Sequence, residues 1–277
     1  MAKNTIFAKK IAEYAKQFYQ QLQEQKYGRY KSWEHCYIFF HSKRGLKFTA
    51  SDYDQLCLHL AFYLASWGMY RGSSFLLQCD YRIHMLAVKE IMNEDYDCLL
   101  GVKCCDLVGK KGSIGYEKRM KIWKLYDKLN KIYDPVRHKV YKEKRCLDDS
   151  EKKEIENNLS ATLVTKILMG TLGCIPAYDR YFIEGVKHKF ELSDGSIMKA
   201  ITTGNCNDNS LIKLIDFYTA NKEYLDAECQ DMVIEDVVYP EGIMKKMPYP
   251  QMKVLDMAFW QIGYDIELKK AKQKKMK

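Results

Sequence analysis

Apolar residues recur every three or four positions along most of the chain, which is the spacing of one face of an α-helix. The first such stripe, within residues 4–26, consists of Ile6, Phe7, Ile11, Tyr14, Phe18 and Leu22. Residues 51–69 are apolar nearly all round, so we expect a central helix that Ser51 or Asp52 caps and Gly68 ends. A stripe of this kind buries one side of a helix against a core.

The same spacing predicts helices in much of the remaining chain. They cover residues 32–43, 81–93, 115–135, 161–170, 180–190, 210–228 and 250–275, although the aromatic residues of 32–43 would also suit a strand. Pro135 should end the third of these, because proline lacks the amide hydrogen that a helix interior needs. Strand signals are few, and no strand–helix alternation or repeat is present.

The pattern therefore predicts an all-α protein with many helices. It forms one mostly helical domain or two helical lobes, 1–134 and 150–265, with a cleft between the lobes and a basic tail, 266–277. The charged stretch around 135–155 is the expected connection between the lobes.

Composition narrows the class of protein. Apolar residues make up 47% and charged residues 29%, which is ordinary for a globular protein. No apolar run reaches the roughly 18 residues that a membrane helix needs, so no membrane partner is expected. The ten cysteines lack zinc-site spacing and are expected to be reduced thiols. The sequence thus predicts a cytoplasmic protein with no metal and no cofactor.

The net charge of +9 is concentrated in two places. Residues 103–145 hold 14 Lys/Arg and 5 Asp/Glu, and residues 269–277 hold six lysines and no acid. Clustered cations attract nucleic acid because they neutralise phosphates and release counterions. The expected contacts are Lys110, Lys111, Lys118, Arg119, Lys121 and Arg180. The alternative is a solvated helix face followed by a solubilising tail.

The stretch LMGTLGCIPAYDRYFIEGVKH, residues 168–188, carries the main candidate for catalysis. An apolar helix, two glycines and an apolar lead-in precede Asp179, which opens a second helix. A carboxylate at a helix start accepts backbone N–H groups, and the helix dipole favours its ionised form. Asp179 is therefore either a helix cap or a catalytic carboxylate at the mouth of a cleft.

This pattern resembles the region around the catalytic Asp of the helix-hairpin-helix (HhH-GPD) DNA glycosylases. The resemblance covers residues 160–190, and it implies a two-lobed all-α fold in which Asp179 faces the cleft. It also implies that Asp179 supports an oxocarbenium-like sugar, or activates water, while a flipped base departs. Lys166 is too near Asp179 in sequence for the Schiff-base lysine of the bifunctional members, so a monofunctional enzyme is expected. The glycine-containing hairpin of the family has no counterpart upstream of Asp179.

A second cluster lies at residues 67–72, where Trp67, Tyr70 and Arg71 surround two glycines. Aromatic rings beside a guanidinium can stack a base and hold a phosphate. Together with Tyr178 these residues form the predicted base pocket. The alternative is a buried aromatic plug in which Arg71 pairs with an internal carboxylate.

Two functions follow from these features. The first is a DNA glycosylase of repair or defence that hydrolyses the N-glycosidic bond of a damaged or modified base. Its partner would be double-stranded DNA with a flipped base, or single-stranded DNA. The second is a non-catalytic nucleic-acid-binding protein that uses the same basic surfaces and keeps Asp179 as a helix cap.

Overall fold

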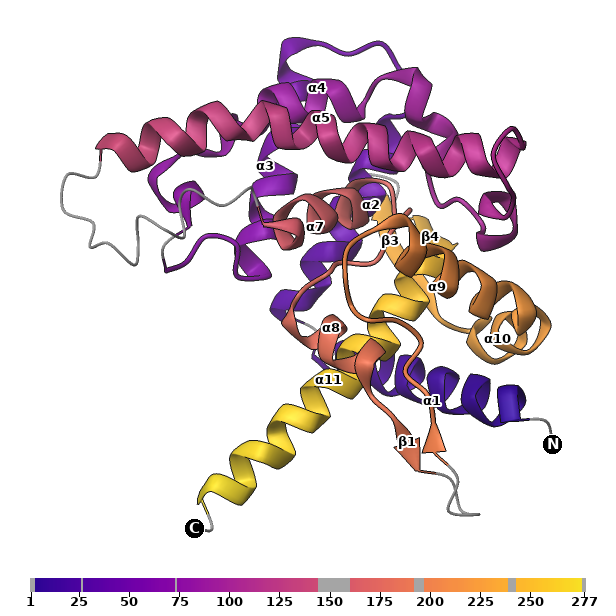
Figure 1. Cartoon of the computed structure of the whole chain (residues 1–277). Helices are drawn as coiled ribbons and strands as arrows, with labels where there is room; N and C mark the ends of the chain where they lie inside the picture. Colours follow the sequence, from indigo (N-terminus) through magenta and orange to yellow (C-terminus); the bar gives the residue numbers. More distant parts are fainter. Residues whose placement is uncertain are drawn as a thin grey trace. The chain divides into compact units, whose positions relative to one another are not determined.

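The computed structural model describes residues 3–25, 27–72, 74–143, 160–191, 197–238 and 243–275. Helices dominate these residues, and the predicted all-α fold class is confirmed (Figure 1). The strands of the described residues form two small antiparallel hairpins. Of the helices in the described ranges, none combines the length and the apolar character that crossing a bilayer requires.

The chain divides into two compact units. Unit 1 comprises Met1–Lys26, Gly101–Glu117 and Cys174–Lys277, and unit 2 comprises Tyr27–Leu100 and Lys118–Gly173. Each unit combines stretches that are distant in sequence, whereas the sequence suggested lobes that are continuous in the chain.

Unit 2 is built around α3 (Ala50–Ser66), which contacts three other helices of the unit. These are α2 (Ser32–Lys43), α4 (Met85–Ile91) and α7 (Ala161–Thr171). Short 3-10 turns complete the unit: η1 (Arg29–Lys31), η2 (Phe75–Gln78), η3 (Tyr81–His84) and η4 (Glu94–Leu99). The segment 32–43, which could have been a strand, is helical.

The ends of α3 follow local chemistry. Thr49 caps its start and forms a capping box with Asp52, so the expected caps Ser51 and Asp52 lie inside the helix instead. The Thr49 side chain accepts the N–H of Asp52, and the Asp52 carboxylate accepts the N–H of Thr49. The helix ends as expected before Gly68, whose φ of 77° is a conformation that favours glycine.

The long helix α5 (Ile114–Glu143) corrects the predicted stop at Pro135. A proline removes one hydrogen bond to the preceding turn, but α5 has buried residues both before and after it. Ile122, Leu125, Leu129 and Tyr133 are fully buried, and the buried Arg137 pairs with Asp134 at 2.9 Å. Packing on both sides of the proline therefore outweighs the missing hydrogen bond.

Unit 1 is organised by α11 (Gln251–Lys275), which packs against α1 (Lys3–Glu24) and α8 (Arg180–Lys187) (Figure 1). The other elements are η5 (Cys104–Leu107), α9 (Asp208–Ala220) and α10 (Lys222–Cys229). The two hairpins are β1 (Phe190–Glu191) with β2 (Ile197–Met198), and β3 (Val233–Val238) with β4 (Ile243–Pro248). Neither hairpin was predicted from the sequence.

Candidate carboxylate site and nucleic-acid interface

Asp179 lies at the N-terminus of α8, where its carboxylate accepts the N–H of Phe182 at 3.1 Å. The preceding segment, residues 174–178, is buried throughout and fixes this position against the core of unit 1. Asp179 itself is 8% exposed. The capping interaction that the sequence predicted is therefore present, and only a small part of the residue reaches the surface.

Two buried charged residues of α11, which the sequence pattern did not single out, lie near Asp179. The ammonium group of Lys253 donates to the Asp256 carboxylate at 2.7 Å, and Asp256 also accepts the N–H of Ala177 at 2.9 Å. Burial raises the pKa of Asp256, and the negative charge of Asp179 raises it further. Their i, i+3 spacing inside an apolar helix was the available sequence signal.

The residues that flank Asp179 have different environments. Tyr178 is 1% exposed, its ring packs 5.1 Å from that of Phe182, and burial raises the pKa of its hydroxyl. Arg180 is exposed, pairs with Glu267 at 3.0 Å and lies over the ring of Tyr181. Tyr178 therefore belongs to the core rather than to an open base pocket, while Arg180 remains a surface cation.

The predicted aromatic turn lies in unit 2 and runs from the buried Trp67, through the half-buried Tyr70, to the exposed Arg71. Trp67 is 8% exposed, and buried Lys166 donates to its carbonyl oxygen at 3.1 Å with the ammonium group 5.3 Å from its ring. Arg71 is exposed and lies against Gly68, where an added Cβ would come within 3.0 Å of the guanidinium carbon. The alternative expectation, a buried aromatic plug, is met by Trp67. Its second part, a pair between Arg71 and an internal carboxylate, is not met among the described residues.

Tyr70 is held by His84, a residue that the sequence pattern did not single out. The two nitrogens of His84 lie 2.8 Å from the Tyr70 hydroxyl and 2.6 Å from the Tyr133 hydroxyl. Burial lowers the pKa of His84 to about 3, so its ring is neutral at pH 7. Because a neutral imidazole has one donor and one acceptor nitrogen, one tyrosine donates to the ring and the other accepts from it.

The predicted basic contacts separate into exposed and buried groups. Lys110 and Lys111 are exposed in the loop before α5, and Lys118 and Lys121 are partly exposed on α5. Arg119 is 3% exposed, because its position falls on the packed side of α5, so it is not a surface cation.

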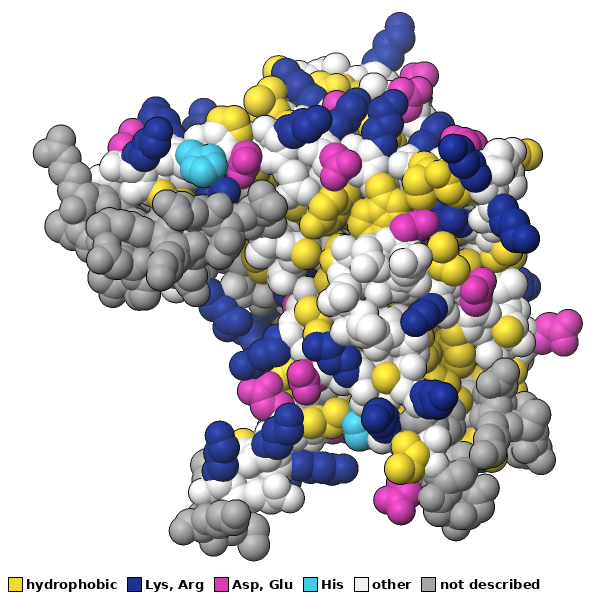
Figure 2. Space-filling model, in the orientation of Figure 1, with side chains coloured by type: hydrophobic (Ala, Val, Ile, Leu, Met, Phe, Trp, Pro, Cys, Tyr) yellow, Lys and Arg dark blue, Asp and Glu magenta, His cyan; other side chains and the backbone are white. Residues whose placement is uncertain are grey.

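The exposed side of α5 in unit 2 carries a row of lysines at helical spacing. We call this row the lysine stripe, and it consists of Lys121, Lys124, Lys128, Lys131, Lys139 and Lys142. The intervals of three, four or eight residues keep these positions on one face, opposite the buried residues Ile122, Leu125 and Leu129. Figure 2 shows dark-blue side chains gathered over α5, whose position Figure 1 gives.

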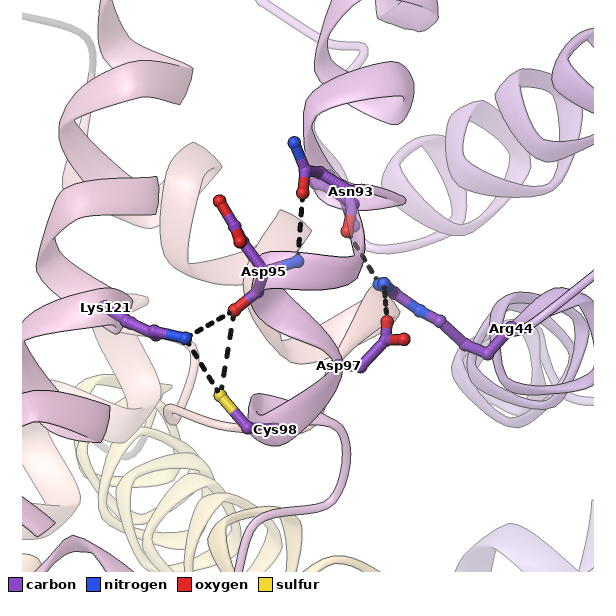
Figure 3. A network of polar contacts seen from close by, with 7 residues as sticks. Arg44, Asn93, Asp95, Asp97, Cys98 and Lys121 are labelled. Atoms are coloured by element: carbon purple, nitrogen blue, oxygen red, sulfur yellow. Dashed lines mark hydrogen bonds and ion pairs between the residues drawn. The ribbon is translucent and has the colours of Figure 1, made fainter. Parts of the chain in front are cut away.

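The first lysine of the stripe is fixed by a polar network with η4 (Figure 3). Lys121 donates to the carbonyl oxygen of Asp95 at 2.9 Å, and its ammonium group lies 3.8 Å from the Cys98 sulfur. On the other side of η4, Arg44 pairs with Asp97 at 2.7 Å. The network therefore ties α5 and the end of α2 to the same short turn.

The remaining lysines differ in their neighbours. Lys128 pairs with Glu90 at 2.6 Å, and Lys139 lies 4.0 Å from Glu143. Lys124, Lys131 and Lys142 form no ion pair with any described residue. Within the described part of the chain, no acidic side chain therefore neutralises these three ammonium groups.

Within the described ranges, no group of three or more His, Cys, Asp or Glu residues is arranged to hold a metal ion. Comparison with protein-family models, with curated proteins and with solved structures found no match to this chain.

Proposed function

We propose that this protein binds nucleic acid non-covalently through the lysine stripe. The supporting observation is a row of six lysines along one face of α5, of which Lys124, Lys131 and Lys142 form no ion pair with any described residue. A surface of this kind gains binding free energy when phosphates replace its small counterions. The buried apolar face of α5 holds the row in place, so its binding requires little ordering of the backbone.

Fluorescence anisotropy with a labelled nucleic acid tests this proposal. We expect binding in the micromolar range at about 0.1 M salt, weakening steeply as salt increases, as for non-specific complexes. Replacing Lys124 and Lys131 by Gln should weaken binding roughly 10-fold per lysine at that salt concentration. Lys213→Gln on α9 of unit 1 removes an exposed charge outside the stripe and is the matched control. Equal losses in the control and the stripe variant would contradict the proposal.

A second candidate function is base excision at Asp179, in line with the resemblance to the helix-hairpin-helix DNA glycosylases. The observation that favours it is the pair formed by Asp179 and Asp256, in which the pKa of Asp256 is raised by burial and by Asp179. Glycosidic hydrolysis commonly uses two carboxyl groups, one of which has a raised pKa and acts as the general acid. The candidate requires a sugar to reach the 8% of Asp179 that remains exposed.

Base excision has a separate test. Plasmids with normal, damaged or modified bases are incubated with the protein and then treated with alkali, which breaks strands at abasic sites. Asp179→Asn should abolish the breaks but preserve the helix cap, because Asn caps helices as well as Asp does. Unchanged strand breakage in this variant, or an absence of breaks with the unmodified protein on every substrate, would reject base excision while leaving nucleic-acid binding intact.

A further inference from the structure

We infer that the lysine stripe binds double-stranded nucleic acid through its phosphates and without reading base sequence. This inference rests on the proposed function and specifies its ligand. Four observations on α5 carry it: the side chains that are buried, the placement of its aromatic rings, the length of the stripe and the burial of its apolar face.

The planar, forked side chains that read base edges most specifically are absent from the exposed stripe. Direct readout uses the forked groups of Arg, Asn and Gln, and also Lys, whose single ammonium group lacks the fork. On α5 both arginines are buried, Arg119 at 3% and Arg137 at 5% exposure. Its one amide side chain, Asn130, donates to the Tyr126 carbonyl at 3.1 Å. The stripe therefore offers ammonium groups, which act as point charges toward phosphates.

The aromatic rings of α5 do not form a stacking platform beside the lysines. Proteins that bind single strands without sequence preference stack bases on exposed aromatic side chains. Here Tyr133 is fully buried, and Trp123 and Tyr126 are half-buried and pack against each other with ring centroids 5.7 Å apart. The two remaining tyrosines of the helix, Tyr116 and Tyr141, are also only half-exposed. A single strand would therefore gain the charge contacts alone, while its flexible backbone would lose entropy on binding.

The length of the stripe matches a duplex. From residue 121 to residue 142 an α-helix rises about 32 Å, close to the roughly 34 Å of one duplex turn. A duplex presents its phosphates at fixed positions over that length, so a row of lysines on a packed helix can meet them without ordering the backbone of either partner. The helix that carries the stripe is held in place, because its buried residues belong to the core of unit 2.

The burial of the apolar face disfavours an anionic membrane. A helix that binds a membrane surface inserts its apolar side chains below the headgroups. Within the described residues of α5, the exposed large apolar side chain is Ile114, seven residues before the stripe begins. The lysines alone would then meet the membrane, without insertion of an apolar face.

The test is competition anisotropy with the full-length protein and a labelled 24-base-pair DNA duplex. The competitors are unlabelled duplexes of AT-rich, GC-rich and mixed sequence, a 24-nucleotide single strand, an RNA duplex, and vesicles of phosphatidylserine with phosphatidylcholine. We expect the duplexes, RNA included, to agree within about threefold and the single strand to compete about 10-fold less well. Vesicles should compete more weakly than the duplexes.

Salt dependence tests the phosphate contacts directly. For B-DNA the slope of log K against log salt has a magnitude of about 0.9 for each phosphate that the protein neutralises. Lys124→Gln/Lys131→Gln should reduce its magnitude by about 1.8, while Lys213→Gln leaves it unchanged. Circular dichroism of each variant confirms that the helices are intact.

The outcomes separate the inference from the proposed function. If no nucleic acid binds, the proposed function fails, and the inference fails with it. If the single strand competes as well as the duplexes, or if duplexes differ more than 10-fold by sequence, nucleic-acid binding stands and the duplex inference is overturned. An unchanged salt slope in the lysine variant also overturns it. If the vesicles outcompete every duplex, the duplex inference is overturned and the stripe binds an anionic membrane instead.

Discussion

Gly185 of α8 lies directly against the backbone carbonyl of Phe259 in α11: a Cβ at Gly185 would be 1.9 Å from that oxygen. The reverse contact also exists, because a Cβ at Gly263 of α11 would lie 2.0 Å from the carbonyl oxygen of Tyr181 in α8. The two helices therefore approach each other at backbone distance through a glycine from each. This contact fixes the helix whose first turn carries the Asp179 cap.

Gly185→Ala should destabilise the protein. In an exposed helix the same change stabilises by up to about 1 kcal/mol, because Ala has the higher helix propensity. Here the added methyl group forces α8 and α11 apart, so we expect a loss of about 3 kcal/mol in the free energy of unfolding, measured with urea. Ala271→Gly, at an exposed position of α11, is the control for propensity alone. A Gly185→Ala protein as stable as the original would contradict the close contact.

Asp256→Asn should cost about 3 kcal/mol, because it leaves the buried ammonium group of Lys253 without its counter-charge. The double variant Lys253→Met/Asp256→Asn removes both charges, so it should be more stable than Asp256→Asn alone. Thermal or urea unfolding of Lys253→Met, Asp256→Asn and the double variant gives the coupling free energy between the two residues. Strict additivity of the two substitutions would show that the pair does not interact.

His84 should make the protein less stable in mild acid. The unfolded imidazole takes up a proton below its ordinary pKa of 6.5, whereas the buried ring stays neutral until its pKa of about 3. Between these two values the unfolded state binds more protons, so the free energy of unfolding rises with pH. Going from about pH 7.5 to about pH 5 should therefore cost about 2 kcal/mol.

His84→Gln isolates this contribution. An amide can donate to one tyrosine and accept from the other, but it does not titrate in this range. The variant should lose stability less steeply than the original protein between about pH 7.5 and about pH 5. Replacing the exposed His35 by Gln should leave the slope unchanged. Parallel curves for His84→Gln and the original protein would refute the assignment.

Asp127→Asn should strengthen duplex binding by about threefold at low salt, because Asp127 is an exposed acid three residues after Lys124 and four before Lys131. It repels the phosphates that these lysines attract. The gain should disappear at about 0.5 M salt, where charges are screened over a few ångströms. Asp216→Asn, an exposed acid of α9 in unit 1, provides the control. Weaker binding by Asp127→Asn would contradict the placement of the ligand along the stripe.

The sequence predicted the helices well because their apolar spacing is strong. The helix over 161–170, the Asp179 cap and the start of α11 near residue 250 were all found in this way. Pro135 misled the prediction, because a local rule about proline cannot weigh the buried residues on both sides of it. The β3–β4 hairpin was missed, since its pairing is set between strands rather than within one.

The site was less predictable for a physical reason. Residue type showed that Arg119 and Trp67 could bind phosphate or stack a base, but their burial depends on how α3, α5 and α7 pack. His84 and Asp256 gained their altered pKa values from burial as well, and a single sequence does not reveal burial of a polar residue directly. The catalytic role of Asp179 stays a prediction.

Because the stripe contains only lysines, its binding of nucleic acid can be regulated by a modification of lysine. Acetylation neutralises a lysine ammonium group, whereas arginine methylation leaves the guanidinium charge in place. Acetyl groups on Lys124 and Lys131 would abolish the same two charges as the glutamine substitutions, and a deacetylase would restore them. An arginine-based surface of equal charge could not be switched off in this reversible way.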